Sequence, residues 1–507
     1  MTRRRGRWTT DARTLLARHW GIAVLLACGA VLRAATMAGY QPALIFIDTP
    51  RYLWMFALGI DPLGYRYLFL KPLLALDPHL ASVTAVQHLL GLAMGAALYA
   101  LVLRHGGRRW LAALAAAPVL LDAYQLQTEQ MIMSDVLFEA LVCAAFLVLA
   151  WPAGQAGNRT WTRVAVAAVI LGIATTVREV GEITLVPLLA YALLAWRKDE
   201  DEDEKEGSRH PAMTRVRLAL TGGALFAIPV LAYMTYSAVT LGAGFGLSNM
   251  SNTYLYARLA DSADCAALRV PSSERPLCPA DQSAGIDFLA NSPTSPVHTY
   301  QPPPGASRTS MFDQFDLAVL TQQPLRVAEK VAADGAKLFA LTRDTAPGDT
   351  PISDWQFQAK YPVFQPAYGY VFRPGGARPQ TNRVIDQALR WYQLHDGYAP
   401  GPLLLVFALL SVFGALDRSS SRQRRAAAAL AGGLAIAVVG GADVYEFIWR
   451  YQLPTLVLLP PGGVLGALAV AETVRRRARS RVTLSPALKP APTAPVTSAA
   501  ESASADS

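Results

Sequence analysis

The sequence predicts an all-α polytopic membrane protein with about ten transmembrane helices. It also predicts interfacial helices in the first outer loop and a large outer loop of mixed structure. Of the 507 residues, 52% are hydrophobic and only 16% are charged, whereas soluble proteins carry roughly 25% charged residues. This composition excludes a disordered chain, a collagen-like fibre and a disulfide-rich mini-protein.

The second observation is the recurrence of uncharged apolar runs that can cross roughly 30 Å of hydrocarbon. About ten such runs follow one another along the chain. They lie near residues 20–39, 80–103, 110–126, 131–151, 161–177, 182–196, 216–238, 400–416, 426–443 and 452–471.

The third observation is where the positive charge lies. If both termini are cytoplasmic, the arginine-rich segments all fall on the inner side, as the positive-inside rule requires. These segments include 3–7, 104–109, 159–163, 197–198, 215–217, 418–425 and 475–479. The net charge of +9 is therefore mostly a topology signal, and we expect no nucleic-acid partner. The first apolar run lacks a cleavage site and is not a removed signal peptide.

These signals divide the chain into five parts. We expect a basic cytoplasmic tail over 1–19, a transmembrane catalytic module over 20–238 and an extracytoplasmic region over 239–399. The last transmembrane helices follow over 400–471, and 472–507 is a cytoplasmic disordered tail rich in Ala, Pro, Ser and Thr. The protein would then lie in the cell membrane with its active site outside.

The outer region 239–399 contains two of the four cysteines. Cys265 and Cys278 are close in sequence, and in an oxidising compartment they could form a disulfide. Residues 312–341 have helical periodicity, which predicts a helix lying on the membrane or on the transmembrane body.

Acidic side chains near hydrocarbon are costly, so they are candidates for function. Asp48 follows the first span in an apolar loop, where it either caps a helix before Thr49–Pro50 or serves chemistry. Glu129 and Asp135 lie at the turn between the third and fourth spans. A helix N-terminus favours acids at such a place, but Asp135 is expected deeper, about one and a half turns into its helix.

Arginines at the outer helix ends are the second group of candidates, because positive charge is disfavoured there. Arg178 ends the fifth span, where it either binds an anion or pairs with Glu179, and Arg450 begins the last one. Arg33, near the end of the first span, either joins them or extends to the interface. An acid can take a proton from an attacking hydroxyl, and arginines can hold a phosphate leaving group.

At these residues the sequence resembles the GT-C superfamily. The resemblance is to its bacterial polyprenyl-phosphate-sugar-dependent branch, which is related to protein O-mannosyltransferases and the lipid A aminoarabinose transferase. Members often show R…P…D(E)xxY at the first helix, and here Arg33, Pro42, Asp48 and Tyr52 match it, without the second acid. Further similar segments are Gln87–Gly91, Glu129–Asp135, Arg178 and Arg450–Pro454.

The resemblance implies sugar transfer from a polyprenyl-phosphate-linked donor to a hydroxyl of an envelope glycan, lipid or protein on the outer face. It implies that Asp48 is the catalytic base, that Glu129 and Asp135 support the acceptor or, in some members, a divalent metal, and that Arg178 and Arg450 bind the donor phosphate. Arg33, Arg51, Tyr52 and Tyr451 would assist. No His/Cys cluster has metal-ligand spacing, and no cofactor is otherwise indicated.

Two other functions fit a polytopic protein. A lipid or sugar transporter or flippase would place ionisable groups near the bilayer midplane and often shows internal repeats. A scaffold of an envelope complex would use the outer region to bind partners, and Asp48 would then be dispensable. The sequence distinguishes neither the sugar nor the acceptor.

Overall fold

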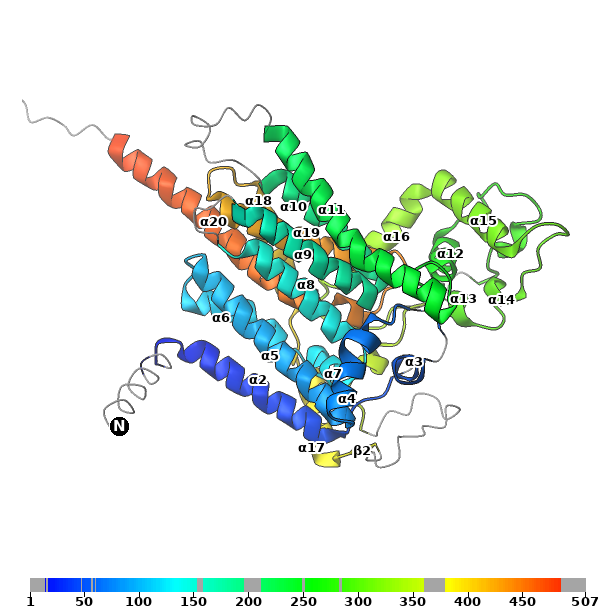
Figure 1. Ribbon diagram of the computed structural model, residues 1–507, viewed down its shortest axis with the longest axis horizontal. Coiled ribbons are helices and arrows are strands. Elements are labelled where there is room, and N and C mark those ends of the chain that lie inside the picture. Colours follow the sequence, from blue (N-terminus) through cyan, green and yellow to red (C-terminus); the bar gives the residue numbers. More distant parts are fainter. Residues whose placement is uncertain are drawn as a thin grey trace, which may run out of the picture.

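The computed structural model describes residues 14, 17–46, 48–55, 58–59, 61–152, 158–195, 211–248, 251–281, 285–359 and 379–484. A helix corresponds to each of the apolar runs, and these helices lie side by side in one elongated bundle (Figure 1). They are α2 (Trp20–Gly39), α5 (Leu80–Arg104), α6 (Arg109–Leu121), α8 (Asp135–Ala150), α9 (Asn158–Val177), α10 (Leu185–Ala195), α11 (Pro211–Tyr236), α18 (Gly401–Leu416), α19 (Arg422–Asp443) and α20 (Thr455–Leu484).

The predicted all-α polytopic membrane fold is confirmed. Within the described residues, 6 helices are long and apolar enough to cross a membrane. The others in the bundle are shorter, from the 11 residues of α10 to the 16 of α8 and α18. Helix α20 continues beyond the expected span to Leu484, and residues 485–507 of the expected tail lie outside the described residues.

Two helix boundaries differ from the expected spans, both near the candidate acids. The apolar run 110–126 is two helices, because the side chain of Asp122 accepts hydrogen bonds from the backbone N–H groups of Tyr124 and Gln125 and so caps α7 (Ala123–Gln130). Helix α8 begins at Asp135 rather than near residue 131. Asp135 is therefore the first residue of its helix, not one and a half turns inside it.

Short elements gather at one end of the bundle. α3 (Thr49–Trp54) and α4 (Lys71–Leu76) lie there, opposite the end where α2 begins and α20 ends (Figure 1). With them are η1 (Arg66–Leu70), η2 (Glu179–Thr184), η4 (Ser237–Leu241), η7 (Ile352–Trp355), η8 (Trp449–Gln452) and α17 (Arg383–Leu394). The two-residue strands β1 (Tyr40–Gln41) and β2 (Gln380–Thr381) pair antiparallel, so the chain near residue 380 returns to the end of α2.

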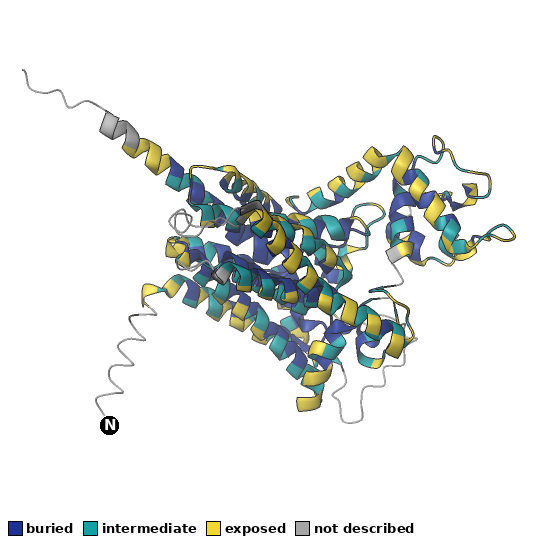
Figure 2. Cartoon of the chain, turned by 45° about the horizontal axis from the view of Figure 1, so that its top comes forward, coloured by how far each residue is buried: buried dark blue, intermediate teal, exposed yellow. Residues whose placement is uncertain are grey.

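A separate lobe follows α11. It consists of α12 (Ser251–Ser262), η5 (Arg275–Leu277), α13 (Ile286–Asn291), α14 (Pro296–Thr299), α15 (Arg308–Gln322) and α16 (Pro324–Lys337). Its own apolar core includes Tyr256 and Phe315, and it projects from the bundle with an exposed outer surface (Figure 2). The single helix expected over 312–341 is two helices, because Pro324 cannot continue the hydrogen-bond ladder of α15.

Arg258 connects the lobe to the bundle, and only 1% of this residue is exposed. Its guanidinium forms an ion pair with Asp334 of α16 and donates to the backbone carbonyl of Asp443 at 2.7 Å. Cys265 and Cys278 form a disulfide in this lobe, with 5.9 Å between their Cα atoms. The other cysteines, Cys28 and Cys143, are free thiols within bundle helices.

We expect the disulfide to be present and the lobe to face outward in spheroplasts. A membrane-impermeant maleimide should label Cys265 and Cys278 only after an impermeant reductant is added, because a disulfide has no thiol to react. Cys265→Ser is the control, since it leaves Cys278 free and reactive without reduction. Labelling of the wild type without reductant would contradict the disulfide, and labelling only after lysis would contradict the orientation.

Candidate active site

The loop after α2 fixes the position of Asp48. Pro50 stands in the first turn of α3, where its missing N–H costs no helical hydrogen bond. The Thr49 hydroxyl accepts from the Phe46 N–H at 2.9 Å and donates to the Ile132 carbonyl at 3.2 Å. Asp48 occupies the cap position, but its carboxylate makes no cap hydrogen bond. The carboxylate is therefore available for contacts outside its own helix.

Asp48 faces Arg450 of η8. Both terminal nitrogens of the Arg450 guanidinium donate to Oδ2 of Asp48, at 3.1 and 3.2 Å. Arg51 lies 3.5 Å from Oδ1 and also forms an ion pair with Asp61. Burial alone raises the pKa of Asp48, but the guanidinium groups of Arg450 and Arg51 outweigh it and hold the pKa below its ordinary 3.8. The carboxylate is thus ionised at neutral pH.

Aromatic rings surround the Arg450 guanidinium. Its central carbon lies 4.6 Å from the ring centre of Trp355, 4.9 Å from that of Tyr451 and 5.4 Å from that of Phe46. Only 8% of Arg450 is exposed, so these rings keep a strong cation in a dry setting. Trp355 belongs to the region 239–399, which therefore contributes a side chain to the surroundings of Arg450.

Asp135 and Arg178 form a second ion pair beside the first. The Arg178 guanidinium lies 4.6 Å from the ring centre of Tyr451, and Arg450 donates to the Tyr451 hydroxyl at 3.2 Å. Tyr451 thus joins the two arginines. The second carboxylate oxygen of Asp135 is buried and accepts no hydrogen bond within the described residues.

The predicted candidates therefore separate into two groups. Asp48, Asp135, Arg178 and Arg450 lie together with Arg51 and Tyr451. Tyr52 is buried beside them and donates to the Ser134 hydroxyl at 3.0 Å. Sequence reasoning missed Asp61 and Trp355, because nothing in their local sequence links them to partners far away in the chain.

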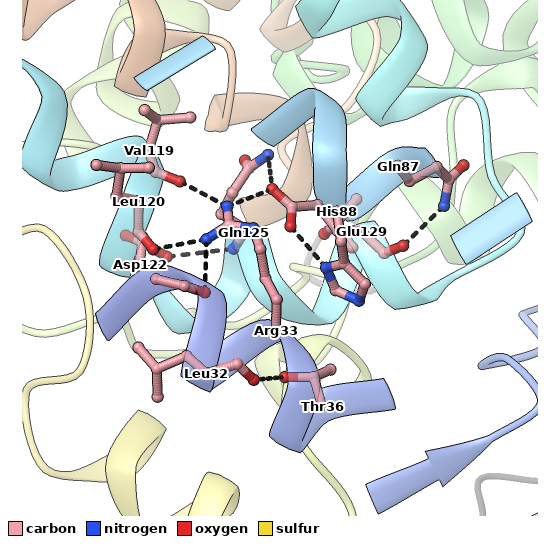
Figure 3. A network of polar contacts seen from close by, with 12 residues as sticks. Leu32, Arg33, Thr36, Gln87, His88, Val119, Leu120, Asp122, Gln125 and Glu129 are labelled. Carbon is pink, nitrogen blue, oxygen red and sulfur yellow. Dashed lines mark hydrogen bonds and ion pairs between the residues drawn. The ribbon is translucent and has the colours of Figure 1, made fainter. Parts of the chain in front are cut away.

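Glu129 and Arg33 form the other group, inside the bundle. The Glu129 side chain is 0% exposed, and its carboxylate accepts from Arg33 at 2.7 Å, His88 at 2.8 Å and Gln125 at 3.1 Å (Figure 3). Arg33 also donates to the carbonyls of Val119 and Leu120. Glu129 thus lies in the interior of the bundle rather than at the edge of the site. The Arg33 side chain likewise does not extend to the membrane–water interface.

The buried group holds the active-site segments in register. His88 contacts the Gln130 side chain at 2.8 Å, and Gln130 donates to the Tyr40 carbonyl at 2.7 Å. The Leu44 N–H donates to the Gln130 carbonyl, and the Ile132 N–H donates to the Leu44 carbonyl. The segment that contains Glu129 is therefore hydrogen-bonded to the segment of Tyr40 and Leu44, which precedes Asp48 in the chain.

No group of three His, Cys, Asp or Glu side chains within the described residues is arranged to hold a metal ion. Asp48 and Asp135 are each bound to an arginine instead. Both pairs lie beside Tyr451, so the arrangement presents cations and carboxylates to the same region.

The bundle of apolar helices defines a polytopic membrane protein with acid–arginine pairs beside one another. The resemblance predicted from the sequence is confirmed by a family model. Residues 79–241 match the family described as dolichyl-phosphate-mannose-protein mannosyltransferase. The matched part includes Glu129, Asp135 and Arg178. Asp48 lies before it in the sequence, and Arg450 lies after it.

A solved structure is also similar. It is the archaeal oligosaccharyltransferase AglB from Archaeoglobus fulgidus in complex with an inhibitory peptide and a dolichol-phosphate. The TM-score is 0.38 and the sequence identity is 12%, over 94% of this chain and 53% of that one. The chain thus spans about half the length of that structure. No curated protein sequence matches the chain.

We expect Glu129→Gln to destabilise the protein and to lower its activity. Gln keeps the size of the side chain but leaves Arg33 as a buried cation without its counter-ion, a change that typically costs about 3–5 kcal/mol. Thermal unfolding in detergent measures the effect. Glu472→Gln is the matched control, because Glu472 pairs with Arg424 and Arg476 near the surface, where such pairs contribute less than about 1 kcal/mol. Equal unfolding temperatures for the two variants would contradict this role of Glu129.

Proposed function

We propose that the protein transfers a sugar from a polyprenyl-phosphate-linked donor to a hydroxyl of an envelope acceptor, on the outer face of the membrane. The observation that carries the proposal is the meeting of Asp48, Arg450, Arg178 and Asp135 around Tyr451. The match of residues 79–241 to a family of polyprenyl-type sugar-phosphate enzymes supports the same class of reaction.

The reaction is a single displacement. The acceptor oxygen attacks the anomeric carbon while the bond from that carbon to the phosphate oxygen breaks. The hydroxyl proton passes to Asp48, and the polyprenyl phosphate leaves with the bonding electron pair. Arg178 and Arg450 stabilise the charge on that phosphate, so no separate acid is required. One displacement inverts the anomeric centre.

Donor binding activates the base. In the free protein both terminal nitrogens of Arg450 are bound to Asp48, and a carboxylate held in this way is a weak base. A donor phosphate competes for the same nitrogens. When Arg450 turns to the phosphate, the pKa of Asp48 rises because its largest opposing charge is withdrawn while its burial remains. The base therefore gains strength only when a donor is present.

Asp135 takes the supporting role. It keeps Arg178 oriented, and its free oxygen lies where it can accept a hydrogen bond from the acceptor or the sugar. Glu129 supports the site from the bundle interior rather than by touching substrate. The carboxylates of Asp48 and Asp135 are each paired with an arginine.

A transporter or flippase is the alternative for this class of protein. Asp48, Arg178 and Arg450 belong to or directly precede α3, η2 and η8, and α3 lies at one end of the bundle (Figure 1). The buried group around Glu129 does lie inside the bundle, but hydrogen bonds occupy its carboxylate on both oxygens. These placements favour transfer over transport.

We expect Asp48→Asn to abolish nearly all transfer while the protein still folds and binds donor lipid. Asn keeps the size and polarity but cannot accept the hydroxyl proton, and a positioned base typically contributes about 10²–10⁴-fold. Turnover of a polyprenyl-phosphate sugar by the purified protein is the measurement. Asp77→Asn, in the same outer loop and bound only to His79 and Ser82, is the control. Activity of Asp48→Asn within about threefold of wild type would remove Asp48 as the base.

We also expect Arg178→Lys and Arg450→Lys to raise the KM for the donor. Lysine keeps the charge but loses the two-pronged geometry that fits a phosphate, and a charge-assisted hydrogen bond is worth about tenfold or more in binding. Steady-state kinetics with varied donor measures the change. Arg326→Lys in the lobe, whose side chain is 54% exposed, should behave like wild type. Unchanged donor kinetics in both site variants would mean that these arginines do not hold the phosphate.

A further inference from the structure

A cavity lies at the end of the bundle opposite the candidate active site. It occupies about 740 Å³ between the first turn of α2 and the turn from α5 to α6. Helix α2 runs from this cavity to Gly39 and the strand beside it (Figure 1). The cavity is therefore separated from Asp48 by the length of a transmembrane helix, and no step of the proposed transfer uses it.

Three arginines line this cavity, and none of the described residues that line it is acidic. Arg18 comes from the segment before α2, and Arg108 and Arg109 come from the start of α6. All three are exposed. None of them forms an ion pair with a carboxylate in the described part of the chain, although Arg424 in the first turn of α19 and Arg476 of α20 both pair with Glu472. Three like charges gathered without a counter-ion favour an anionic ligand.

The rest of the lining is apolar and aromatic. Trp20 is 69% exposed and Trp110 is 61% exposed, and both border the cavity. Tyr99 lies deeper, with its hydroxyl 2.7 Å from His19 Nδ1. Tryptophan is enriched at membrane–water interfaces, where its ring packs against the upper part of acyl chains. A free inorganic anion would make no use of these rings.

We propose that this cavity binds an anionic phospholipid of the leaflet opposite the active site. The phosphate lies among Arg18, Arg108 and Arg109, and the glycerol and first part of the acyl chains lie against Trp20 and Trp110. Basic pockets between transmembrane helices bind anionic head groups through this combination of charge and apolar contact. The proposal does not depend on the reaction that the other end of the bundle performs.

The test uses the full chain in nanodiscs of phosphatidylcholine with phosphatidylglycerol. Lipids that remain bound after extraction into detergent are counted by mass spectrometry. We expect the wild type to retain phosphatidylglycerol over phosphatidylcholine. Arg108→Gln combined with Arg109→Gln should lower that preference about thirtyfold, because each of the two arginines near an anionic lipid contributes about 1 kcal/mol. Arg475→Gln, an exposed arginine of α20 outside the cavity, should leave it unchanged.

Two further measurements distinguish a bound phospholipid from a bound free phosphate. Trp110→Ser should weaken retention of phosphatidylglycerol, whereas a site for free phosphate would not respond. The double arginine variant should unfold near the wild-type temperature and keep its sugar transfer, since neither arginine lies near Asp48. Three results would each overturn the proposal. Inorganic phosphate could displace the lipid fully, or the wild type could retain both lipids equally. The double variant could also lose binding of polyprenyl phosphate instead of binding of phosphatidylglycerol.

Discussion

The buried ion pair of Glu129 and Arg33, to which His88 and Gln125 are hydrogen-bonded, is the constraint on which the rest of the structure depends. Removing such charges from water costs several kcal/mol each, and the gain from pairing seldom exceeds this cost. The pair is therefore poorly explained as a source of stability. Its carboxylate accepts from three different side chains on α2, α5 and α7, so it fixes how these helices are aligned. Any other alignment would leave a buried charge without a partner.

That alignment determines where the reactive groups lie. The carbonyls of Glu129 and Met131 both accept from Gln87, at 2.8 and 2.7 Å, and Gln87 in turn accepts from the Tyr65 hydroxyl. Residues 129–132 are thereby held from one side by α5 and from the other by the segment of Leu44. In the sequence, Ser134 and Asp135 come directly after this segment, and Asp48 comes shortly after Leu44. Both acids of the site thus take their positions from one hydrogen-bonded unit.

The sequence was sufficient to predict the apolar helices and the group of Asp48, Asp135, Arg178 and Arg450, because apolar run length and unusual charge are local signals. It could not predict where Glu129 points, since its partner Arg33 is 96 residues away. The apolar run 110–126 hid the break at Asp122, which depends on a side-chain cap. Trp355 lies in a region without a recognisable pattern, and only the fold brings it to Arg450.

Charge balance links the two halves of the proposed reaction. The negative charges of Asp48 and Asp135 balance the positive charges of Arg450 and Arg178, and Asp61 balances Arg51. A donor phosphate adds negative charge to a cluster that is already neutral. Because that cluster is largely dry, the excess is most easily relieved by uptake of a proton. In the proposed reaction the acceptor hydroxyl supplies this proton, and Asp48 is the carboxylate that loses its arginine. On this proposal, binding of the leaving group and strengthening of the base are the same electrostatic event.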